Sequence, residues 1–359
     1  MKVFIQIFLI LFSVFCFGQK DTNWYAFYNS DSTKIGFKDA EGKIRIEPKF
    51  ENAMMSTDVF KEVIAVWDYG KNYSGEQYYL NKNGEKFGKD SLYVFDFSFA
   101  KESEGKIKFR DQKTDKVGFF DKKGKVVIPA IYNDAGDFQN GIAMIMKDAI
   151  KKCWKENNGK QPQYPDCEHW SWEGTTMVIN TENKELFEIE KQDFIRSIDY
   201  DDTYKNFKLN KNVDSDFYIS YKGSDGNTYS FYCPEMDFKK WFETKFLPDF
   251  KINGKIAEKY FSQTIFLQRK EHSKEISTPI FLDKYSRKTN TLFKEYLQNQ
   301  YNIDFFDKNM FQEENRNLAI DLRLSPKSEN NNIKKASSFH QESIVFTKIG
   351  DSFYITSAP

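Results

Sequence analysis

The chain has 359 residues, with 53 basic and 53 acidic side chains, and aromatic residues make up 17% of it. This much apolar surface excludes a chain kept disordered by low hydrophobicity and high net charge. The lack of a basic excess argues against a nucleic-acid-binding protein, and the length is typical of two domains.

Residues 1–18 have the pattern of a secretory signal peptide. Lys2 precedes an apolar stretch, and Cys16 and Gly18 are small residues at the positions that a signal peptidase requires before Gln19. A buried N-terminal strand or an uncleaved anchor is the alternative. A lipid anchor on Cys16 is disfavoured because the large Phe15 precedes it. No later stretch is long and apolar enough to span a bilayer. We therefore predict an exported protein without a transmembrane segment, located in the periplasm, at the cell surface or outside the cell.

The first half contains an internal repeat. Residues 34–50 (KIGFKDAEGKIRIEPKF) align without a gap with residues 116–132 (KVGFFDKKGKVVIPAIY). Weaker copies lie at 77–86 and 176–184, where Asn183 replaces the turn glycine. Each copy predicts a hairpin with a left-handed turn position. In the two best copies the return strand is expected to end at its proline, and a third strand is expected over 142–146 after the second copy. Such units have one apolar side and must stack to bury it.

These residues resemble the WG-repeat family, over about residues 23–190. The tryptophan that names the family is replaced by Ile35 and Val117. The resemblance implies a β-repeat array that acts as a binding or scaffolding module without a defined active site. The positions that carry the resemblance are Gly36, Phe37, Asp39, Gly42, Pro48, Phe50, Ala53 and Phe60 in the first copy and Gly118, Phe119, Asp121, Gly124, Ile128, Pro129, Tyr132, Ala135, Phe138, Gly141 and Ala143 in the second.

Three cysteines remain after the predicted signal peptide. Cys153 and Cys167 bracket a polar loop rich in proline and glycine, and closing a loop of this length stabilises a protein by about 3 kcal/mol. We therefore predict a disulfide between them. A metal site made of both cysteines and His169 is the alternative, but it has no standard zinc spacing and no fourth ligand. Cys233 is expected to be a buried free thiol.

An insertion over about residues 148–174 interrupts the last repeat units. Trp154, His169, Trp170 and Trp172 lie in it or beside it. These rings either form a binding surface for a protein or an envelope glycan, or pack the disulfide loop onto the repeats.

Residues 191–359 predict a separate α+β domain of unknown type. A hairpin is expected over 217–232, then a helix that begins at Asp237 and is ended by Pro248, and a second helix over 287–300. Strands are expected at 264–268, 318–324, 344–348 and 352–356. The fold class is therefore a mainly β N-terminal repeat array followed by a C-terminal α+β domain.

No motif for catalysis, cofactor binding or a metal is recognised. The acidic residues 199–202 lack the spacing of a calcium loop, and His272 and His340 have no partner in the sequence pattern. We predict an exported, non-enzymatic binding or scaffolding protein of the cell envelope. The alternative is a secreted carbohydrate-binding protein or a hydrolase with its site in the C-terminal domain or at the junction between the domains.

Overall fold

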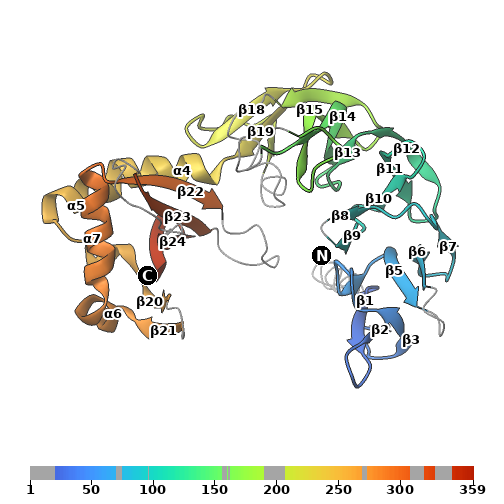
Figure 1. Ribbon diagram of the computed structural model, residues 1–359, viewed down its shortest axis with the longest axis horizontal. Helices are drawn as coiled ribbons and strands as arrows, with labels where there is room; N and C mark the ends of the chain where they lie inside the picture. The colour runs from blue at the N-terminus through green and yellow to red at the C-terminus, as the bar shows by residue number, and fades with distance from the viewer. Residues whose placement is uncertain are drawn as a thin grey trace, which may run out of the picture. The chain divides into compact units, whose positions relative to one another are not determined.

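The structure is a computed structural model that describes residues 21–69, 75–95, 97–155, 160, 162–189, 207–268, 273–307, 319–327 and 342–359. The predicted signal peptide, the acidic residues 199–202, His272 and His340 lie outside these ranges. The chain divides into two compact units, residues 1–189 and 190–359. The predicted fold class is confirmed, because the first unit is a series of antiparallel sheets and the second combines two sheets with helices (Figure 1).

The first unit is built entirely from antiparallel strand pairs in its described residues. Its sheets have the strand orders β4-β1-β2-β3-β5-β6-β7, β8-β9, β10-β11-β12 and β13-β14-β15-β16. The strands are β1 (Trp24–Tyr28), β2 (Lys34–Asp39), β3 (Ile44–Glu51), β4 (Val59–Phe60), β5 (Val63–Tyr69), β6 (Gly75–Asn81), β7 (Lys86–Phe87), β8 (Val94–Phe95), β9 (Ser98–Phe99), β10 (Lys106–Asp111), β11 (Lys116–Asp121), β12 (Val126–Tyr132), β13 (Asp134–Ala135), β14 (Ile142–Cys153), β15 (Trp170–Asn180) and β16 (Glu185–Ile189).

The two best copies of the repeat have the same pairing. Phe37 faces Ile46 in the first copy as Phe119 faces Ile128 in the second, and both pairs adjoin a bulge. The repeat glycine is needed here because a Cβ on Gly118 would lie only 2.5 Å from the carbonyl oxygen of Ile128. The sequence expectation about proline was wrong. Strands β3 and β12 continue through their prolines, because the bulge removes that residue from regular pairing.

A single turn type closes the hairpins of all four copies. In the second copy, the backbone N–H of Asp121 donates to the Lys125 carbonyl, and the N–H of Gly124 donates back to the Asp121 carbonyl. Asn183 adopts the left-handed φ of 66° that glycine supplies elsewhere. The same two hydrogen bonds recur in the second unit, where Gly223 and Gly226 close the hairpin between its second and third strands.

The second unit has a six-stranded sheet, β21-β20-β25-β24-β23-β22, and a three-stranded sheet, β17-β19-β18. All pairs are antiparallel except β20 with β25. The strands are β17 (Lys208–Leu209), β18 (Tyr218–Lys222), β19 (Thr228–Tyr232), β20 (Phe261–Leu267), β21 (Lys274–Ser277), β22 (Tyr301–Asp307), β23 (Ala319–Pro326), β24 (Glu342–Ile349) and β25 (Ser352–Ala358). The helices are α4 (Pro234–Trp241), α5 (Leu247–Asn253), α6 (Thr278–Lys284) and α7 (Ser286–Leu297), with a 3-10 turn at Glu258–Tyr260.

The helix that was expected to begin at Asp237 differs from its prediction at both ends. It begins at Pro234, three residues before the expected cap at Asp237. A π-helical turn, Phe242–Phe246, joins α4 to α5 without a break, and Pro248 is the second residue of α5. The helical segment ends at Gly254 in a left-handed conformation. Its predicted apolar face is buried in the core of this unit: Phe238, Trp241, Phe242 and Phe246.

Candidate functional site

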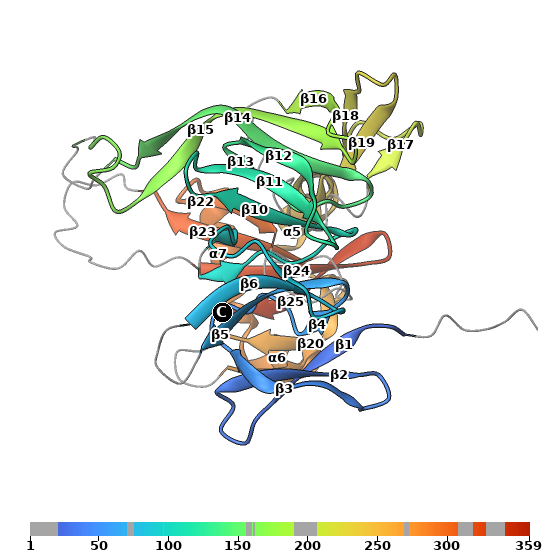
Figure 2. The same ribbon diagram turned by 90° about the vertical axis from the view of Figure 1, so that its right-hand side faces the viewer.

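Strands β14 and β15 form a ribbon that extends beyond the neighbouring strands of their sheet (Figure 2). Cys153 pairs with Trp170 and Lys151 pairs with Trp172 near its end. A disulfide joins Cys153 to Cys167 and closes the loop between the two strands, as the sequence indicated. The two ends of the expected insertion, residues 148–153 and 170–174, are therefore continuations of two repeat strands.

Strand alternation divides the side chains of this ribbon between two faces, because directly opposed residues in an antiparallel pair project to the same side. We call one side the covered face. It carries Lys151, Cys153, Trp170 and Trp172. We call the other side the open face. It carries Ile150, Lys152, Trp154, His169, Ser171 and Glu173. The four aromatic residues singled out in the sequence are thus divided, two to each face.

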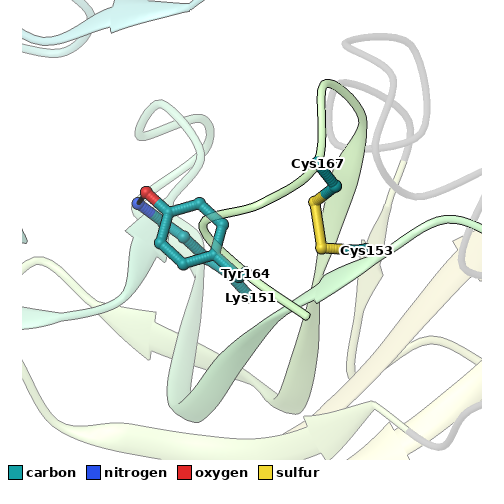
Figure 3. Close-up of a disulfide and its surroundings, with 4 residues drawn as sticks. All are labelled: Lys151, Cys153, Tyr164 and Cys167. Carbon is teal, nitrogen blue, oxygen red and sulfur yellow. Dashed lines mark hydrogen bonds between the residues drawn. A yellow bond between two sulfur atoms is a disulfide. The ribbon is translucent and has the colours of Figure 1, made fainter. Parts of the chain in front are cut away.

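The covered face holds a lysine among aromatic rings. The Nζ atom of Lys151 lies 4.6 Å from the ring centroid of Trp170, 5.1 Å from that of Trp172 and 4.8 Å from that of Tyr164. Tyr164 belongs to the disulfide loop, and its ring lies against the Lys151 side chain (Figure 3). Lys151 Nζ also donates to the Tyr164 hydroxyl at 3.3 Å. A cation held over aromatic faces is attracted by their quadrupoles, so this cage fastens the loop to the ribbon.

Asp115 completes the cage with a negative charge. Its Oδ2 accepts from Lys151 Nζ at 2.7 Å, and its Oδ1 accepts from Arg110 at 3.0 Å. Burial alone would raise the pKa of Asp115, but the hydrogen bond from Lys151 and the charges of both cations lower it below its ordinary value. Burial alone would lower the pKa of Lys151, but the hydrogen bonds to Asp115 and Tyr164 raise it above its ordinary value.

The ion pairs continue from the cage into the preceding repeat. Arg110 on β10 also lies 3.4 Å from Asp134, and the hydroxyl of Tyr93 donates to Asp134 at 2.8 Å. The Arg110 guanidinium lies over the Tyr93 ring, 5.2 Å from its centroid. The ribbon is therefore anchored to neighbouring strands by alternating charges and rings.

The open face, in contrast, is accessible to solvent. The side chains of Trp154 and Ile150 are 59% and 66% exposed. The His169 ring lies 5.5 Å from the Trp154 ring, centroid to centroid, with 34° between their planes. Lys152 forms an ion pair with Glu173 at 2.8 Å. Because Trp154 and Ile150 are exposed on the same face of the ribbon, this face is a candidate contact surface.

The cage consists of Lys151 and the residues that surround it, Tyr164, Trp170, Trp172 and Asp115. Three of these residues were not predicted from the sequence as part of a site: Asp115, Lys151 and Tyr164. The alternation of β14 would have placed Lys151 beside Cys153 and opposite a tryptophan, so that signal was present. Tyr164 is near Cys167 in sequence and follows once the disulfide is assumed. Asp115 comes from another repeat, and no local pattern connects it to the ribbon.

The described residues limit the kinds of functional site that this part of the chain can form. In them, no group of three or more His, Cys, Asp and Glu side chains could hold a metal ion. The alternative zinc site fails for a direct reason, since the disulfide uses both cysteine sulfurs. Cys233 is buried and forms no disulfide. No helix in the described part of the chain has the length and apolar character needed to cross a membrane.

A family model described as WG containing repeat matches residues 35–58 and 118–149. Two segments of the N-terminal half of the chain are therefore similar to WG repeats. This confirms the resemblance read from the sequence, because both matched segments contain the Gly-Phe and Asp-x-x-Gly residues of the two best copies. No curated protein and no solved structure matches the chain significantly.

The second WG match ends at residue 149, and the two faces of the ribbon begin with Ile150. The ribbon residues that form these two faces therefore lie outside the matched segments.

Proposed function

We propose that this protein is exported and uses its WG-repeat unit as a non-enzymatic binding module in the cell envelope. The observation that carries the proposal is the open face of the ribbon, which presents Trp154 to solvent on a rigid support. The covered face, the disulfide and the ion pairs to Asp115 hold that support in place. Binding residues placed on a rigid scaffold lose little conformational entropy on association.

Two observations support export. Residues 1–18 have the composition of a signal peptide, and disulfides persist in oxidising compartments outside the cytosol. The test is to fractionate cells that make the full chain and to determine the N-terminus by mass spectrometry. We expect a mature chain that begins at Gln19 outside the cytosol, whereas a cytosolic chain that retains Met1 would contradict export.

Binding is tested by sedimentation of the mature, oxidised protein with purified envelope fragments from the same cells. Trp154→Ala should abolish co-sedimentation, because it removes the largest exposed ring of the open face. Phe95→Ala is the matched control, since Phe95 on β8 is 69% exposed and lies outside the ribbon. Equal co-sedimentation of the two variants would overturn the assignment of the open face.

A further inference from the structure

The size of the open face limits what it can bind. It offers six side chains, four on the two strands and two just beyond the strand ends, whereas a stable protein–protein interface uses about 20–30 residues on each side. A drug-sized molecule prefers a concave pocket, and a two-stranded ribbon face is not one. The open face is therefore suited to an extended polymer that contacts one aromatic ring and the side chains beside that ring.

The charge of the open face also limits the classes of ligand that it can bind. Its two charged side chains, Lys152 and Glu173, neutralise each other at 2.8 Å. A face without net charge does not attract phosphate, sulfate or polyanionic chains from a distance. Both side chains are about half exposed, so their polar atoms remain within reach of a ligand. They suit hydroxyl groups, which both donate and accept hydrogen bonds.

The aromatic residues Trp154 and His169 give the open face an apolar surface for the ligand. Trp154 and His169 occupy opposed positions where the ribbon enters the loop, and one face of an exposed indole is a flat apolar platform with a polar edge. A sugar ring has the complementary character, because its axial C–H groups form an apolar face and its hydroxyls project around the edge.

We infer that the open face binds a neutral polysaccharide chain. Trp154 stacks against the C–H face of one sugar, while Lys152, Ser171 and Glu173 hydrogen bond to hydroxyls of the sugars beside it. This inference rests on the proposed binding function and names its ligand class. It assigns the ligand to the WG-repeat unit rather than to the C-terminal domain.

The test uses the mature, oxidised full chain on an array of neutral oligosaccharides derived from chitin, cellulose and mannan, with sulfated and uronic-acid glycans on the same array. Affinity electrophoresis through gels containing the polysaccharide that binds then measures the variants. We expect binding to a neutral glycan that is equal at low and high salt. Trp154→Ala should weaken it by at least about tenfold, equivalent to about 1.4 kcal/mol. Trp154→Phe should retain part of the affinity, and Phe95→Ala should retain all of it.

Three results would overturn the inference: no binding to any neutral glycan, equal binding by Trp154→Ala, or binding confined to charged glycans and lost at high salt. The proposed function fails separately. If the array stays blank while envelope fragments still retain the protein through Trp154, the binding function stands, the glycan assignment is wrong, and the occupant is a protein. The urea unfolding curve of each variant, matched to that of the parent protein, shows that the changes in binding do not come from unfolding.

Discussion

Lys151 and Lys152 are neighbours in sequence but lie on opposite faces of the ribbon. Lys151 is 15% exposed and is held by three rings and Asp115, whereas Lys152 is 55% exposed and pairs with Glu173 at the surface. The same division separates Trp170 and Trp172 from Trp154. Aromatic residues that are close together in sequence therefore need not form one surface. Strand alternation buries some of them in packing contacts and leaves the others accessible to a ligand.

The largest expected effect comes from opening the disulfide. Replacing Cys153 and Cys167 together by serine removes a crosslink across a sequence separation of 14, which we expect to cost about 3 kcal/mol of the free energy of unfolding of the N-terminal unit. Tyr164 would no longer be held over Lys151, so the covered face should become accessible. Urea denaturation followed by tryptophan fluorescence measures the loss. An unchanged midpoint would show that the loop does not stabilise the ribbon.

The two lysines provide a matched pair of variants. Lys151→Ala removes a partly buried ion pair and three cation–π contacts, so we expect a loss of about 2 kcal/mol. Lys152→Ala removes an exposed ion pair and should change the stability by less than about 0.5 kcal/mol. Thermal or urea unfolding of both variants checks the difference. Equal losses would contradict the division into a covered and an open face.

The ion pair on the covered face also predicts a pH dependence. The folded pKa of Asp115 lies below the ordinary 3.8, so its contribution is present above that value and is lost as the pH falls through the folded pKa. The folded pKa of Lys151 lies above the ordinary 10.5, so its contribution is present below that value and is lost as the pH rises through the folded pKa.

Asp115→Asn isolates the acid side of this dependence. Because the carboxyl group is half exposed, solvent screens the interaction, and we expect the variant to lose about 1 kcal/mol or less near neutral pH. The difference in stability between parent and variant should shrink as the pH is lowered below about 4. A difference that stays constant in urea titrations from neutral to acid pH would show that the charge of Asp115 is not involved.

The smallest effect on stability is expected on the open face. Trp154→Ala leaves a side chain that is mostly in solvent, so the unfolding free energy should change by less than about 0.5 kcal/mol. Its effect on envelope binding should be the largest of the set. A variant that binds normally but is strongly destabilised would mean that Trp154 packs the loop and does not contact a ligand.

The repeat architecture could be predicted because its determinants are local. The turn glycines, the Gly-Phe pairs and the alternating apolar residues lie within single hairpins, and so does the loop that joins Cys153 to Cys167. The site could be predicted only in part. Trp154, His169, Trp170 and Trp172 were recognised as a group, but their separation depends on the register of β14 against β15, and the position of Asp115 depends on packing between repeats.

The elements of the second unit could also be predicted only in part from the sequence. The buried face of α4 and the helix near Ser286–Leu297 follow from helical periodicity, and β24 and β25 from their hairpin. Strands β21 and β22 and helix α6 were missed, because short or mixed segments depend on their neighbours in the sheet for stability. Pro248 was misread as a helix end because the helix continues through the π-helical turn that precedes this proline, and no single residue predicts such a turn.

Hydroxyl-radical footprinting of the mature, oxidised protein tests directly whether one face of the ribbon is covered and the other is open. Mass spectrometry of the tryptic peptides would give the oxidation rate of each tryptophan. We expect Trp154 to be oxidised several-fold faster than Trp170 and Trp172, and these two to become as reactive as Trp154 when Cys153 and Cys167 are replaced. Equal rates at all three tryptophans in the oxidised protein would contradict this division into a covered and an open face.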